Sequence, residues 1–464
     1  MNLFKNLEKF SGNICVIDEN LNNYTYKDLI TLGDKMTLNI KKRSIVFLIC
    51  ENSYEFLAVY VGLIRKEILV FLISNEINIE SLNKLMELYR PEFLVKPYQK
   101  KINISQLKSI SNFHKKYQIL KTKNKNYKII KNLAILVSTS GSTGTPRFVK
   151  LSYENIFDNA KKIKKYLKIT PRERPITTLQ PNYIYGLSIL NSHLISGSSI
   201  IVNRYSMVEK KFWEILSAAK ATTFGGVPHT YNLLKKLNFE KMNLSSLKYI
   251  TQAGGKINKD LLDKFINICK KKKIKMYVMY GQTEASGRIS YLDWSQIERK
   301  KGSIGKAISG GKIKILKNNK FTNKKNEEGE LIYFGKNVML GYANKIKDLQ
   351  QNIRITKLFT GDLAKQDEDG FFFITGRNSR LIKINSHRFN LDEIEEELKK
   401  NKIYCVCTGH DDNLKIFISH SFNNEILSNL IIKKFNIQRR NFKIFENFKI
   451  PRNENGKVLY GELK

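Results

Sequence analysis

The chain reads Thr139-Ser140-Gly141-Ser142-Thr143-Gly144-Thr145-Pro146-Arg147 directly after an apolar run at Ala134 to Ser138. The apolar run predicts a buried strand. The small residues after it let the backbone come close to an anion, so that N–H groups and hydroxyls can point at a phosphate, and Arg147 adds positive charge. The Gly-Lys-Ser/Thr of a Walker A loop is missing. Taken alone, the stretch suits a phosphate-binding loop and a flexible Ser/Gly turn equally well.

Apolar runs of strand length alternate with helical spacing on both sides of this loop. One helical pattern begins at Ser152 and continues to about Tyr166, and another occupies Asn52 to Arg65. The expected strands share an apolar composition: Ser44 to Cys50, Ile68 to Ile73, Thr222 to Gly225, Tyr249 to Gln252 and Lys275 to Met279. The Lys- and Asn-rich residues 100–131 are interpreted as a surface segment. Buried strands that alternate with helices predict a doubly wound α/β domain.

The pattern changes after about Ser286, where short β runs are separated by glycines. This predicts a β-rich subdomain attached to the large N-terminal α/β domain. A last unit begins near Gly376 and should form a small α+β domain. Its expected helices and strands are Leu391 to Lys400, Tyr404 to Thr408, Leu414 to Ile418 and a helix near Asn424 to Lys434.

The 464 residues carry a formal net charge of +39 and five scattered cysteines. Such a charge suits a nucleic-acid or anionic-membrane surface, and it also suits a bias toward Lys, Asn and Ile over the whole chain. We favour the bias and expect no nucleic-acid partner, because the chain has no long basic tail and no zinc-finger spacing. The N-terminus lacks the apolar core of a signal peptide, and the longest apolar runs are of strand length. We therefore expect no membrane span and a reducing, cytoplasmic location.

Three further motifs carry groups that suit a nucleotide. Tyr280 to Glu284 follows a strand, at the edge where open α/β sheets bind ligands; its ring can stack on a base, its Thr can bond a phosphate oxygen and Glu284 can hold Mg²⁺. Asp362, in a Thr-Gly-Asp turn, can accept bonds from two ribose hydroxyls. Lys457, close to the end of the sequence, can deliver a point charge on a tight turn. Each motif alone is also explained as an ordinary turn or a basic tail.

The order of these motifs resembles the superfamily of acyl-CoA synthetases, peptide-synthetase adenylation domains and firefly luciferase. The resemblance covers nearly the whole chain and is tightest from Leu136 to Lys457. Further pieces that take part in it are Tyr24 to Leu29, Glu51 to Ser53, Ala253 to Gly255, Gly302 to Gly305, Gly329 to Leu331, Gly341-Tyr342 and Arg388 with Glu393 to Glu395. The resemblance implies an AMP-dependent ligase that uses ATP and Mg²⁺ to convert a small carboxylic acid to its acyl-AMP and then passes the acyl group on.

The resemblance also implies a role for each residue of the motifs. The loop would hold the β- and γ-phosphates of ATP through Thr139, Ser140, Gly141, Ser142, Thr143, Gly144 and Arg147. Adenine would lie between Tyr280 and Gly254, with Gln282 in the same nucleotide site. The catalytic set would be Thr283 on the α-phosphate, Glu284 as the Mg²⁺ ligand and Lys457 between the carboxylate and the α-phosphate. Asp362, assisted by Arg377, would hold the ribose.

In this superfamily a small C-terminal domain rotates between the two half-reactions. The resemblance places the hinge at Ser379, where Asp or Lys is usual, and places Lys383 on the segment that enters the site after rotation. We therefore expect an AMP-binding adenylation domain over residues 1–376 and a mobile lid domain over 377–464. Two departures concern the loop, where Arg147-Phe148 replaces the usual Lys-Gly, and the segment that often lines the pantetheine channel, where Ser386 replaces a usual Gly.

The acid pocket is the least specific part of the resemblance. Tyr183 occupies the substrate-gating segment, often with a His in the superfamily, and Gly226, Val227 and His229 are expected in another wall. The segment lacks the Phe-Asp pair that grips the amino group of α-amino acids, so an amino acid substrate is disfavoured. Simple core packing explains Tyr183 equally well.

Three readings of the final activity remain open. We favour CoA as the thiol acceptor, which would make the protein an acyl-CoA synthetase. Loading of a phosphopantetheinyl acyl carrier protein is a close alternative. A nucleotide-binding relative without ligase activity is a third, and the retained Glu284, Asp362 and Lys457 argue against it.

Overall fold

The structure, a computed structural model, describes residues 3–100, 102, 108–114, 116–125, 127–139, 147–353, 355–385, 387–452, 456 and 458–463. Contacts between Cα atoms divide the chain into two compact units. We call Met1–Ser140, Pro146–Lys312 and Tyr333–Leu358 the large unit, and Gly141–Thr145, Ile313–Ile332 and Phe359–Lys464 the small unit.

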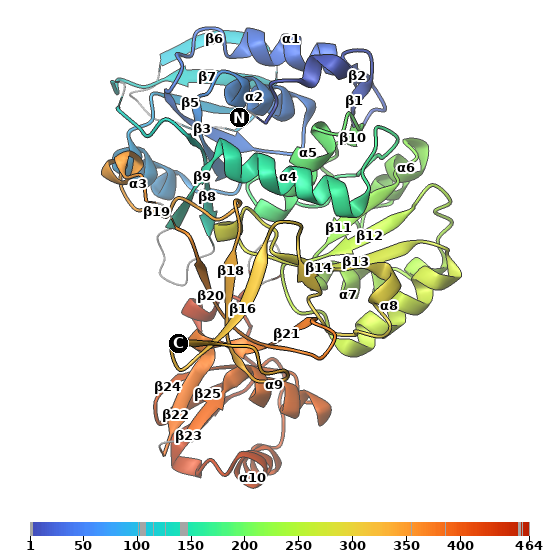
Figure 1. The fold of residues 1–464 in the computed structure, drawn as a ribbon, viewed down its shortest axis with the longest axis vertical. Coiled ribbons are helices and arrows are strands. Elements are labelled where there is room, and N and C mark those ends of the chain that lie inside the picture. Colours follow the sequence, from blue (N-terminus) through green and yellow to red (C-terminus); the bar gives the residue numbers. More distant parts are fainter. Residues whose placement is uncertain are drawn as a thin grey trace. The chain divides into compact units, whose positions relative to one another are not determined.

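An eight-stranded sheet forms the centre of the large unit, in the order β19-β9-β8-β4-β3-β5-β7-β6 (Figure 1). Its central pairs, β8 with β4, β4 with β3 and β3 with β5, are parallel, and its outer pairs are antiparallel. The strands are β3 (Ile45–Cys50), β4 (Leu69–Ser74), β5 (Phe93–Pro97), β6 (Lys108–His114), β7 (Tyr117–Lys121), β8 (Leu133–Thr139), β9 (Arg147–Ser152) and β19 (Tyr342–Ala343).

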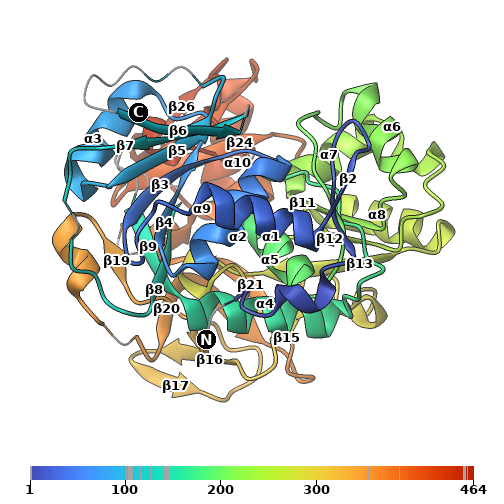
Figure 2. The same cartoon turned by 90° about the horizontal axis from the view of Figure 1, so that it is seen from above.

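Helices cover both faces of this sheet, which explains why its central strands are continuously apolar. Val46, Leu48 and Cys50 of β3 pack on the face covered by α1, α2, α4 and α5, whereas Ile45 and Phe47 pack on the face of α3. Figure 2 shows α1 and α2 running side by side over the strands. The helices are α1 (Tyr26–Met36), α2 (Tyr54–Arg65), α3 (Ile79–Tyr89), α4 (Tyr153–Leu167) and α5 (Ile184–Leu194).

A second sheet of the large unit has the order β11-β12-β13-β14-β15, and its first three strands are parallel. A third, small sheet has the order β10-β1-β2. The remaining elements of the large unit are β1 (Ile14–Ile17), β2 (Asn23–Thr25), β10 (Ile200–Ile201), α6 (Lys210–Ala218), β11 (Thr223–Gly226), α7 (Pro228–Lys236), β12 (Tyr249–Gln252), α8 (Lys259–Lys271), β13 (Lys275–Tyr280), β14 (Ser290–Leu292) and β15 (Lys306–Ala307).

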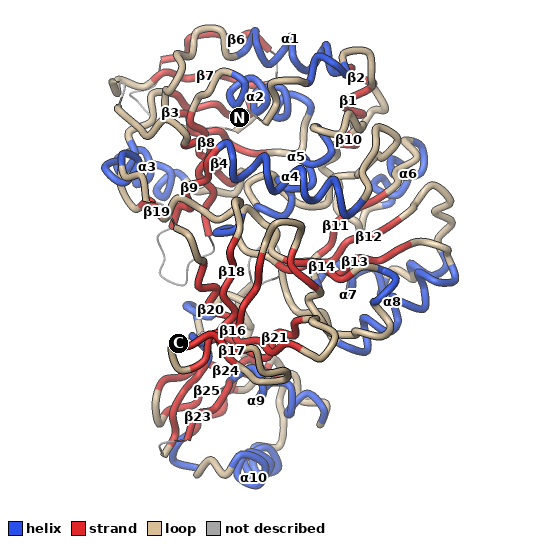
Figure 3. The backbone as a smooth tube through the Cα atoms, in the orientation of Figure 1, coloured by secondary structure: helices blue, strands red, loops and turns tan. Residues whose placement is uncertain are grey.

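The small unit combines a five-stranded sheet, in the order β17-β16-β18-β20-β21, with an α+β part (Figure 3). The sheet contains β16 (Lys312–Lys317), β17 (Lys320–Thr322), β18 (Gly329–Phe334), β20 (Leu358–Gln366) and β21 (Phe372–Arg377). The α+β part contains β22 (Leu381–Ile384), β23 (His387–Asn390), α9 (Leu391–Lys400), β24 (Cys405–His410), β25 (Asn413–Ile418), α10 (Asn424–Phe435) and β26 (Phe442–Phe445).

The observed arrangement confirms the predicted fold class, an α/β domain with a β-rich part and a small α+β part. One expectation is wrong: residues 100–131 are not only a surface segment, because β6 and β7 add two strands to the central sheet there. Tyr117 and Ile119 of β7 are buried in the core, and their burial stabilises this strand although the neighbouring residues in the sequence are polar. In the part of the chain that is described, no helix is long and apolar enough to cross a membrane.

Candidate active site

The predicted phosphate loop joins two adjacent antiparallel strands. Thr139 ends β8 and Arg147 begins β9; the two residues are paired in register, and the Thr139 hydroxyl donates to the Arg147 carbonyl at 3.3 Å. The guanidinium of Arg147 lies 4.9 Å from the ring centroid of Tyr342, a cation–π distance. Residues 140–146, which include the predicted Ser140, Gly141, Ser142, Thr143 and Gly144, lie outside the described residues.

Tyr342 also fixes the predicted metal ligand. Its hydroxyl donates to Oε1 of Glu284 at 2.9 Å, and the Glu284 carbonyl accepts from the Met339 N–H at 2.9 Å. Burial and the neighbouring Glu284 carboxylate raise the pKa of Tyr342, so this phenol remains a donor at neutral pH. A single tyrosine therefore links Arg147, at the end of the phosphate loop, to the carboxylate proposed to hold Mg²⁺. The sequence marks Tyr342 only as part of the resemblance and assigns it no role.

The Tyr280–Glu284 motif begins where β13 ends. Tyr280 is the last residue of β13, and Thr283 opens a short 3₁₀ turn over Thr283–Ala285. The side-chain nitrogen of Gln282 is buried and has no hydrogen-bond partner among the described residues. Such an orphaned donor fits a site that a polar ligand completes. Glu284 fits Mg²⁺, which usually takes one or two carboxylates and completes its shell with substrate phosphates and water.

The predicted gating residue meets the predicted adenine-contacting glycine. Tyr183 is the N-cap residue of α5, and a Cβ built on Gly254 would lie 2.4 Å from its hydroxyl oxygen. Gly254 has φ = +81°, a conformation that favours glycine. The same Cβ would lie 3.1 Å from Val227, so three predicted residues converge. Gly226 is buried beside them at the end of β11, whereas the side chain of His229 is exposed on α7.

The small unit carries the predicted ribose-binding pair in register. Asp362 of β20 faces Arg377 of β21, and Arg377 Nε donates to Asp362 Oδ1 at 2.6 Å. Asp362 is 3% exposed. Its turn is fixed locally, because the Thr360 hydroxyl donates to the Leu331 carbonyl at 2.7 Å and Gly361 adopts φ = +72°. The pairing supports the expectation that Arg377 assists Asp362.

The predicted hinge is followed by a buried ionic cluster. Ser379 lies in a 3₁₀ turn at Asn378–Arg380, and the next side chain, Arg380, donates to Asp392 and Glu395 and lies 4.4 Å from the Tyr460 ring centroid. This cluster ties the segment after Ser379 to α9 and to the C-terminal segment that contains Lys457. The side chain of Lys383 is exposed on β22. Lys457 and Ser386 lie outside the described residues.

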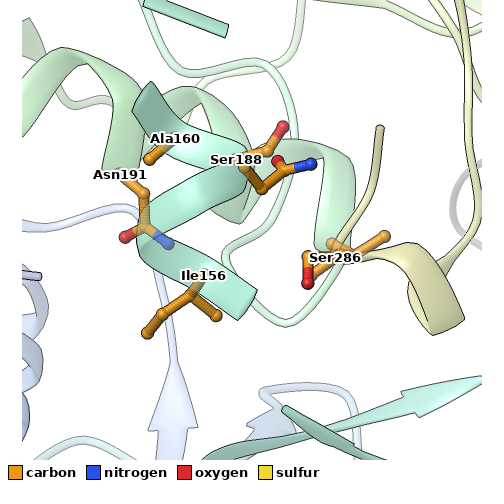
Figure 4. Close-up of a pocket in the computed structure, with 7 residues that line it drawn as sticks. Ile156, Ala160, Ser188, Asn191 and Ser286 are labelled. Carbon is orange, nitrogen blue, oxygen red and sulfur yellow. The ribbon is translucent and has the colours of Figure 1, made fainter. Parts of the chain in front are cut away.

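A small polar cavity lies behind the Tyr280–Glu284 turn. It is lined by Ile156, Asn159 and Ala160 of α4, Ile184, Ser188 and Asn191 of α5, and Ser286 (Figure 4). About 10 Å³ is open to the centre of a water-sized sphere, which is room for about one water molecule. The cavity therefore suits an internal water that satisfies polar groups and is too small for a substrate.

Comparison with known proteins agrees with this geometry. A family described as AMP-binding enzyme matches residues 3–343. The 2-succinylbenzoate–CoA ligase of Geobacillus sp. (strain WCH70) is 28% identical over 347 residues, which cover 72% of this chain and 69% of that protein. The ligase of the same name from Bacillus cytotoxicus is 30% identical over 271 residues, 57% of this chain and 53% of that protein. The chain thus spans only about half the length of the second relative.

Solved structures share the fold over the whole chain. The Bacillus subtilis O-succinylbenzoate coenzyme A synthetase in complex with AMP superposes with a TM-score of 0.79 at 21% identity, covering 100% of this chain and 98% of that one. Its complex with ATP and magnesium ion gives 0.78 at 20%, covering 100% and 99%. The names of the relatives confirm the predicted enzyme class, an AMP-forming acid–thiol ligase. The family match and the ordered motifs together establish that the chain belongs to the AMP-binding enzyme family, within the adenylate-forming superfamily.

Proposed function

We propose that the chain activates a carboxylic acid with ATP as its acyl-AMP, releases pyrophosphate, and transfers the acyl group to the thiol of CoA. One observation carries this proposal: Tyr342 holds the Glu284 carboxylate and the Arg147 guanidinium at the mouth of the phosphate loop. This arrangement places a metal-binding oxygen and a positive charge together, which is what a triphosphate requires.

The first step is a displacement at the α-phosphorus. A carboxylate oxygen of the acid attacks, the bond from the α-phosphorus to the bridging oxygen breaks, and pyrophosphate leaves. A carboxylate is a weak nucleophile and the phosphorus is shielded by negative oxygens, so positioning and charge neutralisation are the main needs. Thr283 would bond the α-phosphate, and Lys457 would bridge it to the attacking carboxylate. Bound Mg²⁺, held by Glu284 and the phosphates, would neutralise the charge of the leaving group.

The nucleoside would be held by residues from several of the sequence motifs. Tyr280 and Gly254 would contact adenine. Gln282, whose side-chain nitrogen has no hydrogen-bond partner among the described residues, would belong to the same site. Asp362 would accept hydrogen bonds from the ribose hydroxyls, and its Oδ1 also accepts from Nε of Arg377. The burial of Asp362 and its bond from Arg377 hold the carboxylate in one place, which suits an acceptor for two adjacent hydroxyls.

The second step forms a thioester and releases AMP. The thiol sulfur attacks the acyl carbonyl of the acyl-AMP, and the bond to the phosphate oxygen breaks. We place a domain boundary at residue 377 and a hinge at Ser379, so that Lys383 enters the site after Lys457 leaves it. Free CoA is favoured over a carrier protein because the relatives are named as CoA ligases. The five cysteines are free, which supports a cytoplasmic location for the enzyme.

The relatives also name the first acid to test. Their names specify 2-succinylbenzoate, and an amino acid remains disfavoured because the Phe-Asp pair is missing. ATP–pyrophosphate exchange with a panel of carboxylic acids, followed by addition of CoA, tests the proposal. Exchange that depends on one acid, and a thioester after CoA is added, are expected.

Variants separate the enzyme from a relative that only binds nucleotide. Lys457→Ala should lower the exchange rate by at least about 100-fold, because it removes the charge between the carboxylate and the α-phosphate. Lys449→Ala removes an exposed lysine nearby in the sequence and should leave the rate unchanged. The proposal fails if no acid supports exchange in the wild type, or if Lys457→Ala exchanges as fast as Lys449→Ala.

A further inference from the structure

Arg288 is the largest fully buried side chain in the described part of the protein. It follows the Tyr280–Glu284 motif, precedes β14, and is 1% exposed. A guanidinium remains charged in proteins, so its burial has a large desolvation cost unless a carboxylate or a set of acceptors compensates. The groups around Arg288 therefore indicate whether this charge serves the fold or a ligand.

The described residues supply no carboxylate to this charge. Every ion pair found among them joins other residues, and the recorded side-chain partners of Arg288 are two neutral hydroxyls: that of Ser188, which accepts from Nη2 at 3.2 Å, and that of Tyr166. The Ser188 hydroxyl donates in turn to the Tyr185 carbonyl at 2.7 Å. The guanidinium carbon lies 5.0 Å from the Tyr185 ring centroid, and Nε has no hydrogen-bond partner in the described part of the chain. Among the described residues the guanidinium therefore has only neutral partners, and its Nε–H donates to none of them.

The backbone of Arg288 is fixed, so the side chain is positioned by the fold. The Asn337 side chain, fully buried, donates to the carbonyls of Arg288 at 2.7 Å and of Ala285 at 2.8 Å. These backbone contacts hold the guanidinium where it is, beside Ser188 and Tyr185. A prepositioned, partly unsatisfied cation is typical of a site that a ligand completes.

Arg288 lines an enclosed cavity at the wall of the expected acid pocket. Gly225, Thr251, Ile189, His193 and Met279 line the same cavity. Gly225 directly precedes Gly226 and Val227, which are expected in the acid pocket. Burial raises the pKa of Tyr183, and the charge of Arg288 opposes that rise, so the guanidinium also acts on this predicted pocket residue. The open space is about 10 Å³ for the centre of a water-sized sphere, so it accommodates an atom group the size of a carboxylate oxygen.

Among the described residues that line this cavity, none besides Arg288 carries a charge. Burial lowers the pKa of His193 to about 4, so it is neutral, and burial raises the pKa values of Tyr166, Tyr185 and Tyr249, so these phenols are neutral as well. Ile189 and Tyr185 fill the space over Gly225, where a Cβ would lie 2.7 Å and 3.0 Å from them. The end of an acid can enter here, whereas a bulky body would have to displace Ile189.

We propose that Arg288 binds a second carboxylate of the substrate, which makes the enzyme selective for dicarboxylic acids. The inference rests on the proposed function and specifies its substrate class. The remote carboxylate would accept from Nε and from a terminal N–H, the paired geometry that guanidinium and carboxylate favour. The other carboxylate would remain at the α-phosphate and react.

Acid selectivity of the wild-type protein is the first test. ATP–pyrophosphate exchange is measured with pairs of a dicarboxylate and a monocarboxylate. Succinate is paired with butanoate and glutarate with pentanoate, at equal carbon number, and 2-succinylbenzoate is paired with 4-oxo-4-phenylbutanoate, which lacks only the ring carboxylate. At least one dicarboxylate should exceed its partner in kcat/KM by about 10-fold or more, the effect of one charged hydrogen bond. Monocarboxylates that equal or exceed their partners in every pair overturn the inference.

Variants distinguish recognition from packing. Arg288→Met keeps the length and removes the charge; it should lower kcat/KM for the preferred dicarboxylate by about 10- to 150-fold, mainly through KM, while the monocarboxylate is unaffected or improves. Arg288→Lys should recover part of the loss. Arg204→Met, at an exposed arginine of the large unit, should change neither acid. Equal losses for both acids in Arg288→Met would show a purely structural role and overturn the inference.

The two proposals fail differently. Absence of exchange with every acid contradicts the proposed function, whereas exchange without preference for a second carboxylate contradicts only the role of Arg288. If Arg288→Met does not fold, as judged by its thermal transition, the wild-type preference alone decides the question.

Discussion

At the scale of single residues, Tyr342 connects two parts of the candidate site that lie far apart in the sequence. Its ring contacts Arg147 and its hydroxyl holds Glu284. The roles of Glu284 and Asp362 could be predicted, because short motifs in a fixed order carry them. The role of Tyr342 could not, because the two contacts exist only after β19 pairs with β9.

Tyr342→Phe should weaken Mg²⁺ use without preventing the reaction. The variant removes one hydrogen bond to the Glu284 carboxylate and keeps the ring beneath Arg147, so we expect the Mg²⁺ concentration for half-maximal exchange to rise about 10-fold. Titration of exchange with Mg²⁺ measures this. Tyr98→Phe, at an exposed tyrosine, is the control, and an unchanged Mg²⁺ requirement in Tyr342→Phe would show that the bond does not orient the metal ligand.

His193 should make the protein less stable in mild acid. Its Nδ1 donates to the Ile189 carbonyl at 2.8 Å, and burial lowers its pKa from 6.5 to about 4. The unfolded chain therefore binds this proton before the folded protein does, and the free energy of unfolding falls as the pH drops from 6.5 toward 4. Between pH 7 and pH 5 the contribution lost is about 2 kcal/mol.

Urea unfolding at pH 7 and pH 5 measures this loss. In His193→Asn the difference between the two pH values should be smaller by about that amount, because asparagine does not titrate. His229→Asn, at an exposed histidine of α7, should behave as the wild type. An identical pH difference in His193→Asn and in the wild type would contradict the assignment.

The burial of Arg288 could not be predicted from the sequence pattern. An arginine three residues after a turn reads as a surface charge, and its burial follows from packing of α5 and β14 around it. That no carboxylate of the described residues pairs with it depends on how the chain folds, so no spacing in the sequence could indicate it.

At the scale of elements, the central strands were predictable because both of their faces are buried. The expected strand at Lys275 to Met279 corresponds to β13, and the helix expected from Ser152 corresponds to α4, whose N-cap is Ser152. The strands β6 and β7 were missed because their surroundings are rich in Lys and Asn. β7 pairs with β5 and β6 pairs with β7, and local composition does not reveal such pairing with a neighbouring strand.

The close contact between α1 and α2 at Gly33 and Gly62 should not tolerate an added methyl group without a loss of stability. A Cβ on Gly62 would lie 2.4 Å from the carbonyl oxygen of Gly33 and 2.7 Å from its carbon, which are backbone atoms that cannot move independently of α1. Gly62→Ala should therefore lower the free energy of unfolding by about 1–3 kcal/mol.

Denaturant unfolding at neutral pH checks this expectation, with Gly12→Ala as the matched control. A Cβ on Gly12 meets nothing within 4 Å, so that variant should be neutral or slightly stabilising. Equal stability of the two variants would show that the helices can separate without cost.

At the scale of the whole molecule, the order of motifs along the chain was the strongest predictor. Each motif alone suits an ordinary turn, whereas their sequence from Thr139 to Lys457 matches one superfamily, and the family match over residues 3–343 confirms it. The boundary at residue 377 and the hinge at Ser379 stay predictions, because they concern a motion between two states. We assign no separate binding site to the net charge of +39.

Formation of an acyl-AMP is the central claim, and the fate of the carboxylate oxygen tests it most directly. The preferred acid is labelled with ¹⁸O in its reacting carboxyl group and converted to the thioester with ATP and CoA, and the nucleotide and phosphate products are analysed by mass spectrometry. The account predicts AMP that carries one ¹⁸O per turnover, together with unlabelled pyrophosphate. ADP as the nucleotide product with ¹⁸O in inorganic phosphate, or AMP without label, would contradict it.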